Sequence, residues 1–75
     1  MKLHTVDKGK MVTITSLEEI NMPLRLRLRS VGIKEGCSIC IKQKGILSGA
    51  CILSCEGLNV GLRKKDMMKI EVKSV

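Results

Sequence analysis

The stretch PLRLRLRSVGI, residues 23–33, decides the fold because two of its features predict different secondary structures. Leucine and arginine alternate strictly along it, which is the period of a half-buried β-strand. Its boundaries are those of a helix: Asn21 suits the N-cap, Pro23 the first turn, and Gly32 followed by apolar Ile33 a left-handed stop. We give the boundaries more weight than the alternation and predict a short α-helix.

A helix near residues 22–31 places the leucines and arginines on different faces. Arg25 and Arg29 stack one turn apart, and Arg27 points away from both. An apolar stripe at i, i+4 and i+7 is expected to face the core; it comprises Leu24, Leu28 and Val31, with Leu26 at its flank.

The rest of the chain has the pattern of short strands separated by turns. Apolar alternation marks five segments: KMVTITSL (10–17), the segment that begins near Gly36 (GCSICIKQ), ACILSCEG (50–57), LNVGLRKKD (58–66) and MMKIEVKSV (67–75). The glycines of KGILSG (44–49) predict a turn before the third segment. Strands of this kind predict a small barrel that hides its edges by closing. We expect an all-β, mainly β fold of about five strands with one short α-helix, in a single domain over residues 1–75.

The composition limits the functions open to the chain. Its 75 residues carry a formal net charge of +7, which favours acidic partners: nucleic acid, an anionic membrane surface or an acidic protein face. Phe, Tyr and Trp are absent, so the aromatic platforms that hold single-stranded nucleic acid and proline-rich peptides are missing. Neither a run of about 18 apolar residues nor a secretory signal is present. We expect a cytoplasmic protein with no small-molecule substrate and no cofactor.

Basic residues gather in two places in the sequence. The run RKKD is by default a solvated turn, and charge runs on small domains commonly form the solvated face. A net charge of +7 on so short a chain exceeds what solubility needs, so the same residues are candidates for a partner-binding surface. The candidates are Arg25, Arg27 and Arg29 in the predicted helix and Arg63, Lys64 and Lys65 in the run.

The four cysteines are expected to be free thiols, because disulfides are rare in a reducing cytosol. They are Cys37, Cys40, Cys51 and Cys55. Their spacing superficially resembles that of a structural zinc site. If the segments flanking KGILSG pair as a hairpin, Cys37, Cys51 and Cys55 face the core and Cys40 faces the other side. Core packing is therefore favoured, and a CxxC held in a tight knuckle is the alternative.

Catalysis is not expected from this set of residues. His4 is the single histidine and has no neighbouring carboxylate or thiol in the sequence, so a solvated or capping role is favoured over a ligand or a general base. Neither a Ser/His/Asp or Cys/His arrangement nor a glycine-rich phosphate loop can be assembled.

These residues resemble the FeoA family over nearly the whole chain. The family's RLxxLGIxxG is similar to RLRSVGIKEG, residues 27–36, in which Val31 stands where leucine is usual. The family's later pattern consists of a glycine, alternating apolar residues, a second glycine and a terminal LR. It is similar to residues 49–57 followed by VGLR at 60–63, and Ala50 replaces the usual proline.

The resemblance implies an SH3-like barrel with a helix where PLRLRLRSV lies. It also implies a non-enzymatic accessory protein of bacterial ferrous iron transport. Such a protein binds the cytosolic side of a membrane Fe(II) permease with a GTPase domain, of the FeoB type, and reaches the inner face of the membrane through that partner. A direct iron carrier is not supported, because ferrous sites favour clusters of histidine and carboxylate. Metal binding by the barrel and weak homo-oligomerisation are left open.

Two other functions stay open on the sequence. A small basic barrel is suited to nucleic acid by its charge, although it lacks aromatic side chains. A metal-sensing or metal-binding domain would use Cys37 and Cys40 with Cys51 or Cys55. The same barrel occurs as the C-terminal domain of metal-dependent repressors, but 75 residues leave no room for a DNA-binding domain, so the transport accessory is preferred.

Overall fold

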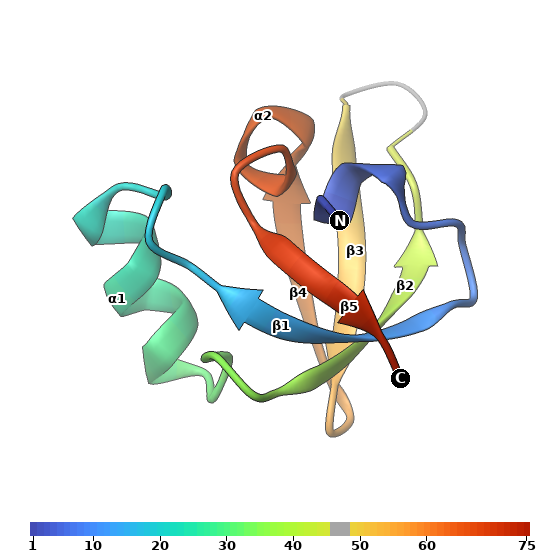
Figure 1. Cartoon of the computed structure of the whole chain (residues 1–75), viewed down its shortest axis with the longest axis horizontal. Coiled ribbons are helices and arrows are strands. Elements are labelled where there is room, and N and C mark those ends of the chain that lie inside the picture. The colour runs from blue at the N-terminus through green and yellow to red at the C-terminus, as the bar shows by residue number, and fades with distance from the viewer. Residues whose placement is uncertain (46–48) are drawn as a thin grey trace.

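Five β-strands and one α-helix of nine residues dominate the structure (Figure 1). This computed structural model describes residues 1–45 and 49–75; residues 46–48, inside the predicted turn KGILSG, lie outside the described residues. None of the helices in these two ranges is long and apolar enough to cross a bilayer. The elements are η1 (Leu3–Thr5), β1 (Met11–Ser16), α1 (Met22–Ser30), β2 (Ser38–Gln43), β3 (Ala50–Cys55), β4 (Leu58–Arg63), α2 (Lys64–Met67) and β5 (Glu71–Ser74).

The strands form one antiparallel sheet in the order β4-β3-β2-β1-β5, which confirms the five predicted strands. Burial follows the strand period of two, because alternate side chains point to opposite faces of the sheet. In β3, Cys51, Leu53 and Cys55 are buried while Ile52 between them is exposed. The sheet coils around this buried face, so the core lies inside a small barrel (Figure 1).

The predicted helix is present and its ends are fixed by the residues that predicted them. The Asn21 side chain accepts a hydrogen bond from the Leu24 N–H at 2.9 Å, which satisfies a donor that the first turn leaves free. At the other end Gly32 adopts a φ of 90°, and the Ile33 N–H donates to the Leu28 carbonyl oxygen at 2.9 Å. This is a glycine C-terminal stop with an apolar residue after it.

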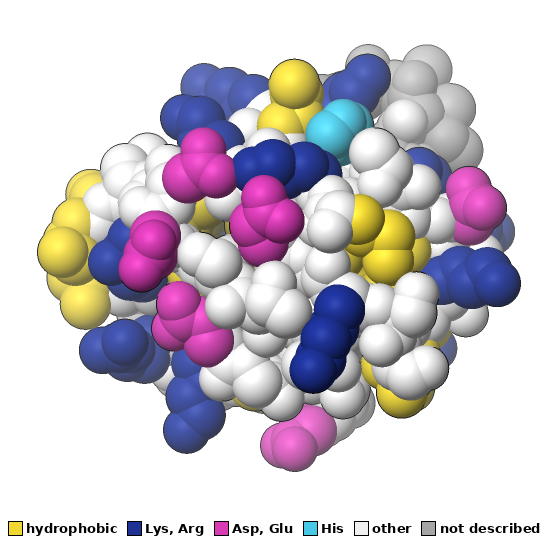
Figure 2. All heavy atoms as spheres, in the orientation of Figure 1, with side chains coloured by type: hydrophobic (Ala, Val, Ile, Leu, Met, Phe, Trp, Pro, Cys, Tyr) yellow, Lys and Arg dark blue, Asp and Glu magenta, His cyan; other side chains and the backbone are white. Residues whose placement is uncertain are grey.

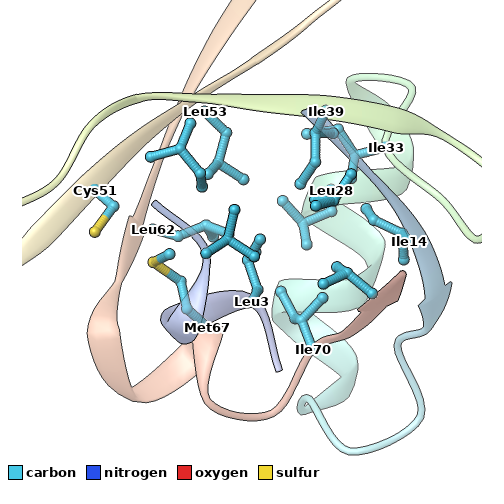
Figure 3. Close-up of a cluster of buried hydrophobic side chains, with 14 of the residues drawn as sticks. Leu3, Ile14, Leu28, Ile33, Ile39, Cys51, Leu53, Leu62, Met67 and Ile70 are labelled. Atoms are coloured by element: carbon cyan, nitrogen blue, oxygen red, sulfur yellow. The ribbon is translucent and has the colours of Figure 1, made fainter. Parts of the chain in front are cut away.

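Leu28 anchors α1 to the barrel. It is the one buried residue of α1, with 0% of its surface exposed, and it belongs to the same hydrophobic cluster as Ile14, Ile33 and Ile39 (Figure 3). Because these side chains come from α1, β1, β2 and the turn after α1, one contact region holds the helix against two strands.

The apolar stripe of α1 is narrower than predicted. Leu24 is half-buried, but Leu26 and Val31 are 56% and 38% exposed. The prediction for Val31 was wrong because the helix ends before it and Val31 is the C-cap. The chain then reverses at Gly32, and Ile33 enters the core in its place.

The two edge strands of the sheet, β4 and β5, differ in whether another segment of the chain covers them. A barrel closed edge to edge was expected, but β4 and β5 are the ends of the sheet and do not pair with each other. The N-terminal residues cover β5: the Met1 ammonium donates to the Val72 carbonyl oxygen at 3.1 Å, and the Val72 N–H donates to the Met1 carbonyl oxygen at 2.8 Å. Lys2 Nζ then forms ion pairs of 2.7 Å with Glu19 and Glu71.

The cations of the run RKKD are exposed, as in the predicted solvated turn, but the turn is helical. Arg63 ends β4, and the three residues after it lie in α2. Met67, which is fully buried, draws this segment toward the core and so favours a helical turn. Lys64 and Lys65 stay exposed on that turn.

Leu28→Ala is expected to lower the free energy of unfolding by about 2–5 kcal/mol, because it removes a fully buried side chain from a packed core. Leu26→Ala makes the same chemical change at an exposed position of the same helix, and a shift below about 0.5 kcal/mol is expected. Urea unfolding followed by far-ultraviolet circular dichroism measures both. Equal losses in the two variants would contradict the role assigned to Leu28.

Candidate functional site

Two hollows that share Arg27 lie between α1 and the β4–α2 segment. The larger measures about 290 Å³ and is lined by Asn21, Pro23, Leu24, Arg27, Arg63, Lys65 and Asp66. The smaller measures about 190 Å³ and is lined by Arg27, Leu28, Val31, Asn59, Val60 and Gly61. We call the two hollows together the α1–β4 groove.

The groove brings together three of the predicted partner-binding residues. Arg27 comes from α1, Arg63 from the end of β4 and Lys65 from α2, and all three are exposed. Asp66 is the one acidic residue among the described residues that line the groove. Within residues 1–45 and 49–75, every ion pair involves the Met1 ammonium or Lys2, and none involves these cations. Their charge is therefore available to a ligand.

The other three predicted residues lie elsewhere. Arg25 is half-buried, and its Nη2 donates to the Glu18 carbonyl oxygen at 2.7 Å, which ties α1 to the segment before it. Arg29 lies one turn further along α1 and lines neither hollow of the groove. Lys64 faces a different hollow, shared with His4. The run RKKD is thus divided, because successive residues of a helical turn point in different directions.

Sequence reasoning missed the β4 residues of the groove. Asn59, Val60 and Gly61 line its smaller hollow. Their alternation predicted a strand correctly, but a strand pattern does not indicate which strand lies beside the helix. That proximity depends on how α1 packs across the barrel.

A separate hollow of about 220 Å³ contains the histidine. Its lining residues are His4, Lys44, Gly45, Gly49, Cys51, Lys64 and Met67. The His4 side chain is half-buried, and its Nδ1 has no hydrogen-bond partner among the described residues. The Cys51 sulfur accepts a hydrogen bond from the Gly45 N–H at 3.4 Å, and no hydrogen bond joins it to His4. Two of the lining residues, Gly45 and Gly49, adjoin residues 46–48, which lie outside the described residues.

The cysteines lie where strand parity predicted them. Cys51 and Cys55 are buried in the core, Cys37 packs against its edge, and Cys40 is half-buried outside it, opposite Ser54. All four are free thiols. In the part of the chain that the structure describes, no three His, Cys, Asp or Glu side chains converge as a metal site would require. Burial, and then the neighbouring thiol of Cys37, raises the pKa of the Cys55 thiol.

Alkylation with iodoacetamide is expected to modify Cys40 and Cys37 of the native protein before Cys51 and Cys55, because buried thiols react only when the fold opens. The raised pKa further lowers the thiolate fraction of Cys55 at neutral pH. A thiol whose pKa is higher in the folded than in the unfolded chain favours the folded state while it is protonated. For Cys55 this contribution to the free energy of unfolding is fully present below the ordinary thiol pKa of about 8.5, and it is lost as the pH rises through the pKa of the folded state. Peptide mass spectrometry over time measures the order; alkylation of Cys55 as fast as Cys40 would contradict it.

Comparisons with known proteins agree with this fold. The family model described as the FeoA domain matches residues 1–74. The FeoA protein of Chlorobium tepidum is 23% identical in sequence, with a TM-score of 0.93 over 100% of this chain and 70% of that one. The iron(II) transport protein A of Clostridium thermocellum is 31% identical, with a TM-score of 0.86 over 100% of this chain and 46% of that one.

A similar barrel is found in a regulatory protein. A manganese-dependent transcriptional repressor is 20% identical, with a TM-score of 0.82 over 100% of this chain and 41% of that one, which shows a shared fold. None of the curated proteins compared with the chain matches it. The family match, in contrast, covers almost the whole sequence and agrees with the mainly β barrel that carries helix α1. The chain therefore belongs to the FeoA family and has its SH3-like fold.

Proposed function

We propose that this chain is a non-enzymatic accessory protein of ferrous iron transport that acts in the cytoplasm. Its partner is an acidic surface on the cytosolic side of a membrane Fe(II) permease with a GTPase domain, of the FeoB type. Family membership supports the role in ferrous iron transport. The α1–β4 groove supports the binding of a protein partner, because it gathers cations from three separate elements without neutralising them.

The chemistry of the groove suits an acidic protein better than a small molecule. Arg27, Arg63 and Lys65 line the larger hollow, and the half-buried Val60 and the exposed Val31 line the smaller one. Figure 2 shows hydrophobic side chains beside Lys and Arg over α1, at the left of the molecule. A surface with apolar contacts and complementary charge around them is typical of a protein interface, where the charges select and orient the partner.

Both elements contribute to each hollow of the groove. Arg27 of α1 lines both hollows, Arg63 at the end of β4 lines the larger one, and Asn59, Val60 and Gly61 of β4 line the smaller one. The interaction proposed here therefore involves α1 and β4 together.

The non-enzymatic role is supported by the surroundings of the nucleophiles. Cys51 and Cys55 are buried, and Cys37 donates to the Gly32 carbonyl oxygen at 3.0 Å. Among the described residues, no hydrogen bond connects a thiol to His4, as activation by a general base would require.

The double variant Arg63→Glu, Lys65→Glu is expected to bind the purified cytosolic GTPase domain of the permease at least about tenfold more weakly, because it places two negative charges in a groove that selects an acidic surface. The matched control is Lys8→Glu, Lys42→Glu, which changes the net charge equally at exposed positions that line neither hollow of the groove. At about 0.15 M salt its affinity should stay within about twofold of the unmodified chain.

Isothermal titration calorimetry measures both double variants. Equal weakening in the two would show that net charge alone drives association. Unchanged affinity in Arg63→Glu, Lys65→Glu would remove the groove as the binding face.

A further inference from the structure

Strand β4 leaves one row of backbone groups free along the groove. The register of β3 and β4 places Arg63 opposite Ala50 and Gly61 opposite Ile52. The next pair along is Lys64 and Gly49, and it is hydrogen-bonded, since the Lys64 N–H donates to the Gly49 carbonyl oxygen at 3.1 Å. Bonded and non-bonded pairs alternate along an antiparallel ladder. The N–H and C=O groups of Asn59 and Gly61, and the N–H of Arg63, therefore point away from β3.

The other edge of the sheet shows that this chain can cover such a row. On β5, the outward groups of Val72 exchange two hydrogen bonds with Met1, and Lys2 lies opposite Glu71. Within the described residues, no backbone group makes the equivalent contact with Asn59 or Gly61. An edge left open in this way is a template for another strand.

We propose that β4 is a strand-addition site for an extended acidic segment of a protein partner. The segment pairs with the outward backbone groups of Asn59, Gly61 and Arg63 and places carboxylates beside Arg27, Arg63 and Lys65. This inference rests on the proposed function, because it uses the same α1–β4 groove, and it adds how the partner is recognised.

The lining of the groove specifies the segment. Its cationic end, at Arg63 and Lys65, selects carboxylates, while Val60 and Val31 at the other end select an aliphatic side chain. A segment that lies along β4 therefore carries carboxylates toward Arg63 and an aliphatic side chain toward Val60, and a peptide of alternating acidic and aliphatic residues presents both kinds at either end. Main-chain hydrogen bonds supply affinity in this mode of binding and side-chain positions supply specificity. The sugar–phosphate backbone of a nucleic acid has no N–H donors with which to continue the ladder.

The direct probe is the acetylated and amidated heptapeptide EVEVEVE, titrated into the isotope-labelled full chain and followed by amide chemical shifts. We expect saturable shifts at Asn59, Gly61 and Arg63. Two further peptides carry N-methyl groups, one on its valines and the other on its glutamates. In the added strand, the N–H groups of every second residue point toward β4, and those of the residues between them point away. One of the two methylated peptides should therefore lose at least about tenfold in affinity, and the other should stay within about threefold of EVEVEVE.

A protein variant tests the same edge from the other side. Gly61→Pro removes an N–H that points away from β3, and the β3–β4 ladder is kept because proline is tolerated on an edge strand. A Cβ at this position meets its nearest atom, the Cys51 carbonyl oxygen, at 4.0 Å, which is ordinary van der Waals contact. The peptide should bind at least about fivefold more weakly. Ser74→Pro removes an outward N–H near the end of β5 and serves as the matched control, with unchanged affinity expected.

The outcomes separate this inference from the proposed function. If the GTPase domain binds but EVEVEVE gives no shift on β4, or if both N-methylated peptides bind like the parent, strand addition is wrong and the charge-based interface stands. If Asn59 and Gly61 shift with protein concentration in the absence of peptide, a second copy of the chain occupies the edge and the proposed occupant is wrong. Should Gly61→Pro fail to fold, the N-methylated peptides decide alone.

Discussion

The packing of Leu28 into the barrel is the contact on which the rest of the structure depends. The chain has no Phe, Tyr or Trp, so aliphatic side chains, two buried thiols and the thioether of Met67 fill its core. Leu28 brings α1 into that core, and the caps at Asn21 and Gly32 fix where the helix begins and ends. Arg27 is its neighbour on the helix and is rotated by about 100° from it, which carries the guanidinium toward β4. A core contact thus sets the position of a surface charge.

The groove follows from the way the sheet ends. Met1 and Lys2 cover β5, whereas β4 remains beside α1 with its outer backbone groups facing the groove. Met67, buried at the end of α2, holds the turn on which Lys65 lies next to Arg63. The same local structure therefore supplies the cations and the open strand edge, and both features favour an extended acidic partner.

The sequence predicted the elements well and the site only in part. Leucine–arginine alternation alone predicts a strand over residues 24–29. The capping residues predict a helix instead, because they satisfy the backbone donors and acceptors that the ends of a helix leave free. Val31 was misplaced because a helical stripe assumes that the helix continues, whereas Gly32 ends it. Arg27 could not be paired with Arg63 from sequence, since their proximity arises from tertiary packing. Treating RKKD as a helical turn would have separated Lys64 from Lys65.

The central claim is that α1 and β4 together form the face that meets the transporter. An amide chemical-shift titration of the labelled chain with the unlabelled cytosolic GTPase domain of the permease, at about 0.15 M salt, tests it most directly. The account predicts that the perturbed amides cluster on Leu24–Val31 and Asn59–Lys65. Perturbations centred on β5 and the N-terminal residues, or a spectrum unchanged at saturating partner, would contradict it.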